Sequence, residues 1–201
     1  MKLAHIIFDF DGVLADTNDV NFAIAKGLHP EITTEDFMAH HDGNVYEEPR
    51  IPFTDATSVA YRAQYHAALS ESHVARASDP VSQLAEQYAL YVISSSSEDA
   101  IRAVLESSGL ASKFTRIMGY ETHTSKVEKF SMLMREHGVT TDNAVFITDT
   151  LGDIREASKV GLKTIAETFG FHDRARLEQG EPYAIADSWD EVLHEITLLE
   201  K

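Results

Sequence analysis

Six polar side chains of this 201-residue sequence stand where short apolar runs end or where predicted helices begin. If those runs are parallel strands, their carboxyl ends share one edge of a sheet, and α/β proteins gather functional groups at that edge. Four carboxylates, one hydroxyl and one ammonium group would then converge on a single site. These residues are Asp9, Asp11, Ser94, Lys126, Asp149 and Asp153.

The excess of carboxylates over cations at this edge predicts a divalent metal ion. A single lysine cannot balance four aspartates, and like charges held close together raise the pKa of one another. An all-oxygen site with positions left for water and substrate suits Mg²⁺. Asp9, the backbone carbonyl of Asp11 and Asp149 are the candidate direct ligands. Asp153 would act through a water molecule or orient the other ligands.

The same residues could transfer a phosphoryl group. With Mg²⁺, Lys126 and Ser94 neutralising the phosphoryl oxygens, Asp9 can attack phosphorus and form an aspartyl-phosphate. Asp11 lies two residues further on and can protonate the leaving oxygen and later deprotonate water. Gly12 lets the backbone turn beside it, and backbone N–H groups at this turn could help to bind the phosphate.

Two of these assignments have competitors nearby in the sequence. Ser94 is followed by three more serines that could cap the next helix, and the strand register favours Ser94, with Ser95 as a neighbouring substrate ligand. Lys129 lies one turn beyond Lys126. The capping box at residues 125–128 places Lys126 at the helix entrance, and therefore nearer the strand ends.

Six apolar, β-rich runs are expected to form the sheet, and most of them are continuous, as in a parallel sheet covered on both faces. Capped helices separate the later runs, so strand and helix alternate from residue 89 onward. This order predicts a doubly wound α/β fold. We expect strands at 4–10, 89–93, 116–119, 144–148, 164–166 and 183–186, and helices at 98–107, 126–137, 152–160 and 188–199.

The interval between the first two strands is too long for a simple crossover. About sixty residues lie there without a convincing strand, whereas a crossover needs only a dozen or so plus its helix. The pattern predicts helices at 19–26, 35–41 and 56–70, with the chain returning to the core at residues 79–80. The predicted division is a core of residues 1–15 and 79–201 and a small helical cap of residues 16–78, over the carboxyl ends of the strands.

Residues of this helical insert could contact the part of a substrate that lies beyond the phosphate. Arg50, in a turn-rich loop, is the main candidate. An exposed helix face explains the other polar residues of the insert equally well, and its aromatic residues are expected to form the core of the insert. The polar residues are Lys26, His40, His41 and Arg62, and the aromatic ones are Phe37, Tyr61 and Tyr65.

The stretches around the six polar residues resemble the motifs of the haloacid dehalogenase (HAD) superfamily, and they occur in the order of that family. The insert is similar to the C1 cap of its phosphoglycolate phosphatase and β-phosphoglucomutase branch. The resemblance implies a Rossmann-like core, Mg²⁺ and phosphoryl transfer through Asp9. Thr148 departs from the glycine of many members, at a position that should not touch the metal. The matching stretches are FDFDGVLADT at 8–17, YVIS at 91–94, Lys126, and ITDTLGD at 147–153.

The composition narrows the remaining possibilities. The chain has no cysteine, which excludes disulfides, zinc ribbons, iron–sulfur clusters and thiol catalysis. Its 17 basic and 33 acidic residues give a net charge of −16, which disfavours nucleic-acid and anionic-membrane partners. No apolar run approaches the ~20 residues that span a bilayer, and no signal-peptide pattern is visible. A cytoplasmic monomer or homodimer is therefore expected.

The leading hypothesis is a Mg²⁺-dependent phosphatase for a small phosphorylated metabolite, with the insert closing over the substrate. A phosphomutase of the same superfamily is a close alternative that the core motifs do not distinguish. Phosphonate cleavage would need a lysine of the insert for a Schiff base, and Lys26 is the candidate. The alternative from a different class is a non-catalytic phospho-binding or signalling module, although receiver domains lack such an insert after the first strand.

Overall fold

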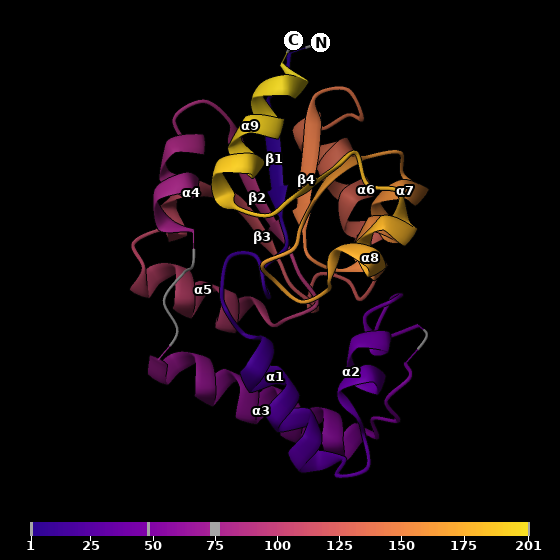
Figure 1. Cartoon of the computed structure of the whole chain (residues 1–201). Coiled ribbons are helices and arrows are strands. Elements are labelled where there is room, and N and C mark those ends of the chain that lie inside the picture. Colours follow the sequence, from indigo (N-terminus) through magenta and orange to yellow (C-terminus); the bar gives the residue numbers. More distant parts are fainter. Residues whose placement is uncertain (1, 48, 73–76, 201) are drawn as a thin grey trace.

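One six-stranded sheet with all its strands parallel forms the centre of the computed structural model, which describes residues 2–47, 49–72 and 77–200 (Figure 1). The strand order is β3-β2-β1-β4-β5-β6. The chain builds outward from β1 on one side and outward from β4 on the other, so the order reverses between these two strands. The strands are β1 (His5–Phe8), β2 (Ala89–Ile93), β3 (Phe114–Met118), β4 (Ala144–Thr148), β5 (Lys163–Glu167) and β6 (Ala184–Ala186).

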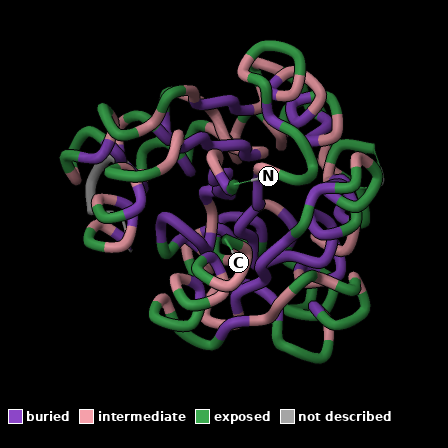
Figure 2. The backbone as a smooth tube through the Cα atoms, turned by 90° about the horizontal axis from the view of Figure 1, so that it is seen from above, coloured by how far each residue is buried: buried purple, intermediate pink, exposed green. Residues whose placement is uncertain are grey.

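Helices cover both faces of the sheet, which explains why the central strands are continuously apolar. In β1, Ile6 and Phe8 belong to a core with α5 (Glu98–Ser107) and α9 (Trp189–Leu199). Ile7 points to the opposite face and packs with α6 (Lys126–His137) and α7 (Leu151–Lys159). Buried backbone accordingly fills the centre of the molecule, and the outer turns of the helices are exposed (Figure 2). The predicted fold class is confirmed.

The helical insert lies beyond the carboxyl ends of the strands, away from both chain termini (Figure 1). It contains α1 (Asn18–Leu28), α2 (Thr34–His40) and α3 (Asp55–Ser72). Ala25, Ile32, Phe37 and Ile51 give it an apolar core, which Phe171 from the segment after β5 completes. The insert therefore shares its packing with the sheet side of the molecule.

Hydrogen bonds also tie α2 and the residues after it to the sheet side. The backbone N–H of Gly152, in the first turn of α7, donates to the carbonyl of His41 at 2.9 Å. The Nε2 atom of His172 lies 3.0 Å from the carbonyl oxygen of Met38, and its Nδ1 accepts the N–H of Leu151 at 3.0 Å. This part of the insert is thus held next to the start of α7.

The structure differs from the predicted elements in a few places. The first strand ends at Phe8, two residues before the predicted end, because the chain turns sharply after it. The third strand begins at Phe114, two residues before the predicted start. Two short helices were not predicted, α4 (Ser78–Leu84) and α8 (Arg174–Leu177). Pro80 sits in the first turn of α4, where a missing N–H is tolerated.

None of the helices in the described part of the chain combines the length and apolar character needed to cross a membrane.

Candidate active site

Asp9 stands where the order of the sheet reverses. It follows the last residue of β1, and its backbone N–H donates to the carbonyl of Ile147 in β4 at 2.9 Å. The chain then turns back on itself, and the N–H groups of Leu14 and Ala15 both donate to the carbonyl of Phe10. In open α/β sheets the crevice at such a switch point is the usual ligand site.

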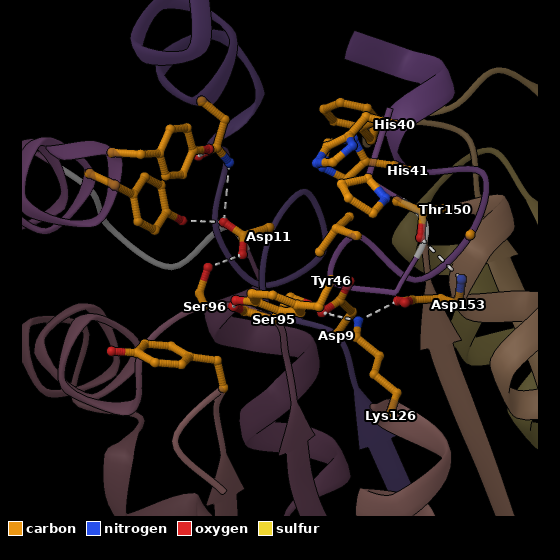
Figure 3. A pocket seen from close by; sticks show the side chains of 18 of the residues that line it. Asp9, Asp11, His40, His41, Tyr46, Ser95, Ser96, Lys126, Thr150 and Asp153 are labelled. Atoms are coloured by element: carbon orange, nitrogen blue, oxygen red, sulfur yellow. Dashed lines mark hydrogen bonds and ion pairs between the residues drawn. The ribbon is translucent and has the colours of Figure 1, made fainter. Parts of the chain in front are cut away.

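Lys126 bridges two carboxylates at the bottom of this crevice (Figure 3). Its ammonium nitrogen lies 2.9 Å from Oδ1 of Asp9 and 2.6 Å from Oδ2 of Asp153, and the residue is 3% exposed. Burial alone would lower the pKa of Lys126, but the charges of Asp153 and Asp9 outweigh burial and raise the pKa. Thr148 donates its hydroxyl to Oδ2 of Asp153 at 2.7 Å. The threonine that departs from the family pattern therefore orients Asp153.

The pKa values of the two carboxylates beside Lys126 are shifted in opposite directions. Burial and the charge of Asp153 raise the pKa of Asp9 well above its usual range. Burial acts upward on Asp153 as well, but the charge of Lys126 and hydrogen bonds at this carboxyl group bring its pKa below the usual value. One ammonium group is thus enough to keep Asp153 ionised. The anionic form of Asp9 needs further positive charge.

Asp149 follows β4 and carries a carboxylate oxygen without a hydrogen bond. The residue is fully buried, and its Oδ2 accepts the backbone N–H of Phe171 at 2.7 Å. Its Oδ1 is buried and has no hydrogen-bond partner. Burial, and then the charges of Glu167 and Asp153, raise the pKa of Asp149 well above its usual range. A buried acceptor without a donor is costly, and a cation bound there would remove that cost.

These donor groups fit a hard divalent cation. Three buried carboxylates, those of Asp9, Asp149 and Asp153, lie here, and the ammonium group of Lys126 contacts two of them, those of Asp9 and Asp153. Every candidate ligand atom is an oxygen. Among the described residues, no three His, Asp or Glu side chains already form a metal-binding group. Mg²⁺ characteristically uses one or two carboxylates and completes its shell with water and phosphate oxygens. Gly12 leaves room here, because a Cβ atom on it would lie 1.7 Å from Oδ2 of Asp149.

The side chain of Asp11 points toward the insert (Figure 3). Its Oδ1 accepts the hydroxyl of Thr17 at 2.7 Å and also the phenol hydroxyl of Tyr65 from α3. The amide of Asn21 in α1 is 3.4 Å from the same oxygen, and the hydroxyl of Ser96 donates to Oδ2 at 2.6 Å. Three segments that are distant in the sequence therefore hold this carboxylate on the insert side of Asp9.

The serines after β2 occupy different places. Ser94 is fully buried, and its hydroxyl accepts the backbone N–H of Ser96 at 2.9 Å. Ser95 and Ser96 line the cavity in front of Asp9, and Ser94 is not among the lining residues. Ser97 caps α5 by accepting the N–H of Ala100. The buried hydroxyl of Ser94 therefore stabilises the turn, whereas Ser95 and Ser96 are the residues that face the cavity.

Lys129, the competitor of Lys126 one turn further along α6, is fully buried. Its ammonium nitrogen lies 2.5 Å from the carbonyl oxygen of Ser94. Burial and the charge of Lys126 lower the pKa of Lys129 to about 7. The residue supports the end of β2, whereas Lys126 faces the cavity.

A cavity of about 280 Å³ separates the strand ends from the insert. Both groups of residues line it, with Asp9, Asp11, Lys126 and Asp153 on the sheet side. The insert contributes mainly rings, at Phe37, His40, His41, Tyr46, Phe53, Tyr61 and Tyr65. The structure therefore gives the reactive carboxylates a lined space that could hold a small molecule.

Two cationic residues of the insert that were proposed from the sequence lie outside this cavity. The side chain of Arg50 is 61% exposed and its guanidinium is 3.9 Å from Asp42. Its contribution near the cavity is its backbone N–H, which donates to Nδ1 of His40 at 3.1 Å. Lys26 donates to the carbonyl of Ile32 at 2.6 Å within the insert. Neither cation is among the residues that line the cavity.

Other residues of the site were not singled out from the sequence. Glu156, in α7, accepts the backbone N–H of Lys126 at 2.9 Å and the amide of Asn44 at 3.0 Å. It follows Asp153 by three residues on the same helix face, a spacing that could have drawn attention to it. Tyr65 was predicted to belong to the core of the insert; it is buried, but it packs in the larger core with Leu14 and Ile101, and its hydroxyl contacts Asp11.

Comparisons with known proteins agree with this arrangement. A phosphoglycolate phosphatase from Synechococcus elongatus is 28% identical over 211 residues, covering 96% of this chain and 97% of that protein. A phosphoglycolate phosphatase from Aliivibrio fischeri is 22% identical and 94% of each chain is covered. The structure of a haloacid dehalogenase-like hydrolase from Streptococcus pneumoniae has a TM-score of 0.78 at 21% identity, with 96% of this chain and 98% of that chain covered.

A hydrolase from Pseudomonas syringae superimposes with a TM-score of 0.82 at 17% identity, over 98% of this chain and 100% of that one. The family model for haloacid dehalogenase-like hydrolases matches residues 6–167. That span contains Asp9, Lys126 and Asp153 in the order that the sequence suggested. The predicted resemblance, including its phosphoglycolate phosphatase branch, and the prediction of a phosphatase enzyme of this kind are thereby confirmed. The chain belongs to the haloacid dehalogenase-like hydrolase family.

Proposed function

We propose that the protein is a Mg²⁺-dependent phosphatase that hydrolyses a small phosphorylated metabolite through an aspartyl-phosphate on Asp9. The observation that carries this proposal is the buried group of Asp9, Lys126 and Asp153 at the switch point of the sheet. Its carboxylates outnumber its cations, and a divalent ion bound among them would offset both this excess and the charge of a substrate phosphate. The phosphoglycolate phosphatases among the relatives support the same class of reaction.

The residues that would hold Mg²⁺ are Asp9, the backbone carbonyl of Asp11, and Asp149, with Asp153 acting through water or by orientation. The unpartnered Oδ1 of Asp149 supports this set most directly. When bound, Mg²⁺ would neutralise phosphoryl oxygens and so reduce their repulsion of the Asp9 carboxylate. Lys126 would remain beside Asp9, and Ser95 and Ser96, with Gly12 at the turn, would lie around the phosphate in place of Ser94.

In the first step an oxygen of Asp9 attacks phosphorus and the bond from phosphorus to the ester oxygen breaks. Asp11 gives its proton to that oxygen, and the alcohol leaves. Asp11 then takes a proton from water, whose oxygen attacks the aspartyl-phosphate and releases inorganic phosphate and free Asp9. Asp11 stands on the insert side of Asp9, which is where the alcohol part of a substrate would extend.

We propose that residues 16–78 act as a cap over this site and residues 1–15 and 79–201 as the catalytic core. The aromatic wall that the insert gives the cavity supports this division. Closure would exclude bulk water and protect the aspartyl-phosphate from competing reactions. The expectations of a cytoplasmic enzyme, a monomer or homodimer without nucleic-acid or membrane partners, belong to the same proposal.

Phosphomutase activity is the second candidate, because the core would form the same aspartyl-phosphate. The phosphonate alternative loses support, since Lys26 donates to Ile32 and does not line the cavity. A non-catalytic phospho-binding module is disfavoured by the intact set of Asp9, Asp11 and Lys126 around one cavity.

The test is release of inorganic phosphate from p-nitrophenyl phosphate by the purified full chain, with and without EDTA. We expect turnover with Mg²⁺, its loss with EDTA, and its loss in Asp9→Asn protein that keeps its far-ultraviolet circular dichroism. Asp142→Asn, at an exposed aspartate outside the cavity, is the matched control. Wild-type rates in Asp9→Asn would refute the nucleophile. Phosphate transfer to an added sugar phosphate without release would favour the mutase.

A further inference from the structure

The wall of the cavity opposite the carboxylates is built from aromatic rings. Phe53 makes edge-to-face contacts with His29 and Tyr61, at 5.0 and 5.4 Å between ring centroids. Tyr61 is stacked on Tyr65, with 6.2 Å between centroids and 14° between ring planes. On the sheet side the wall continues with Tyr120. The rings brace one another and so form a preorganised apolar surface.

Three tyrosines that line the cavity already use their hydroxyl groups in hydrogen bonds. The hydroxyl of Tyr46 donates to the carbonyl of Ser95 at 2.8 Å, and that of Tyr61 donates to the amide oxygen of Asn21 at 2.7 Å. The hydroxyl of Tyr65 donates to Asp11. These tyrosines therefore have their ring surfaces, rather than their hydroxyls, to offer to a molecule in the cavity.

Positive charge is scarce on this wall. Burial, with the nearby His41 and Arg50, lowers the pKa of His40 to about 3, so its ring is neutral near pH 7. Of the residues that the structure describes along the cavity, Lys126 and Arg62 carry the permanent positive charges. Lys126 is paired with two carboxylates, and Arg62 lies over the ring of Tyr120, 5.3 Å from its centroid.

The size of the cavity exceeds the need of a two-carbon ester. The volume of about 280 Å³ lies near the lower end of the range for small-molecule pockets, roughly 300–1,000 Å³. A phosphate group and a two-carbon acid would fill only part of it. They would also bring a further carboxylate into a cavity that five acidic side chains already line, those of Asp9, Asp11, Asp149, Asp153 and Glu156.

We propose that the natural substrate is the phosphate monoester of an uncharged, ring-bearing alcohol, not of a small carboxylic acid such as glycolate. The phosphate faces Asp9 and Lys126, and the ring of the alcohol packs against Phe53, Tyr61 and Tyr65. This inference rests on the proposed phosphatase function. It separates the chain from the activity that its relatives' names state, because those names concern a substrate with an added carboxylate.

The experiment compares three primary alkyl esters, so that the leaving group differs little in reactivity: benzyl phosphate, glycerol 1-phosphate and 2-phosphoglycolate. We expect kcat/KM for benzyl phosphate to exceed both others by at least about tenfold, since burying a ring is worth at least that factor. Hydrolysis of all three at equal efficiency would overturn the inference and leave the phosphatase function intact. Hydrolysis of none of them would overturn the inference, and it would overturn the phosphatase function as well only if p-nitrophenyl phosphate were not hydrolysed either.

Substitutions of Phe53 test whether the aromatic wall causes the preference for benzyl phosphate. Phe53→Ala is expected to raise KM for benzyl phosphate with little change in kcat, and to lower kcat/KM for it about tenfold more than for glycerol 1-phosphate. Phe53→Leu, which keeps most of the apolar volume, is expected to retain most of the preference. Thermal unfolding of each variant controls for folding. Equal losses for both esters in Phe53→Ala would contradict the proposed contact.

Arg62 provides the opposing test, because it is the described cation that could bind a substrate carboxylate. Replacement Arg62→Gln should leave benzyl phosphate the preferred ester. Efficient hydrolysis of 2-phosphoglycolate that disappears in Arg62→Gln would show that the site selects an acid, and the inference would be wrong.

Discussion

Removing the hydroxyl of Tyr65 tests how Asp11 is held. Tyr65 is 5% exposed, and the substitution Tyr65→Phe keeps its ring stacked on Tyr61 while deleting the donor to Oδ1 of Asp11. A hydrogen bond to a charged group contributes about 1.5–3 kcal/mol. We expect the lower part of this range, about 1.5–2 kcal/mol, because Thr17 and Ser96 still donate to the carboxylate.

For a chain of this length, each kcal/mol changes Tm by about 2–4 °C, so Tm should fall by about 3–8 °C. Urea unfolding followed by circular dichroism gives the free energy. Tyr61→Phe is the matched control, since its hydroxyl donates to the neutral amide of Asn21 and its loss should cost only about 0.5–1.5 kcal/mol.

A double-mutant cycle decides whether the effect passes through Asp11. In Asp11→Ala protein, Tyr65→Phe should be close to neutral, because both partners of the hydrogen bond are then absent. Equal losses in the two backgrounds, additive within about 0.5 kcal/mol, would refute the reasoning.

Three further outcomes are expected. Mg²⁺ at about 100 times its Kd should stabilise the protein by ~2.7 kcal/mol in thermal unfolding, and Asp149→Asn should lose most of this gain. Glu156→Gln should cost about 1–3 kcal/mol in urea, since a charged acceptor for Lys126 N–H and Asn44 is lost; an unchanged midpoint would contradict this. Burial lowers the pKa of His172 to about 4. The neutral ring is therefore favoured on folding, and stability should fall by up to about 3 kcal/mol between pH ~6.5 and ~4, a slope that His172→Asn should flatten.

The sequence predicted the reactive side chains at strand ends because each follows an apolar run that could only be a buried strand. Asp9 and Asp149 end up beside each other because β1 and β4 are neighbours, which the doubly wound pattern already implied. Lys126 was identified from its place at a helix entrance, and the structure puts its ammonium between Asp9 and Asp153. Local signals and topology were sufficient for these residues.

The remaining parts of the site depend on turns and long-range contacts that no local pattern encodes. Four consecutive serines look alike in sequence, and only the turn in which Ser96 N–H donates to Ser94 Oγ decides which hydroxyls face the cavity. Tyr65 meets Asp11 across 54 positions of the chain. Arg50 was selected for its loop, yet its backbone and not its guanidinium reaches His40.

The segment that leads into α7 has two structural roles. Residues 149–153 present two carboxylates to the cavity, and within them the N–H of Gly152 fastens the insert through the carbonyl of His41. A Cβ on Gly152 would lie 2.5 Å from the carbonyl oxygen of Gly43, so even a methyl group would push the insert away from α7. A substitution that separates the insert from the start of α7 would also move the carboxylates of Asp149 and Asp153. The position of the insert and the position of the two carboxylates therefore depend on the same short segment, and a substitution there would change both.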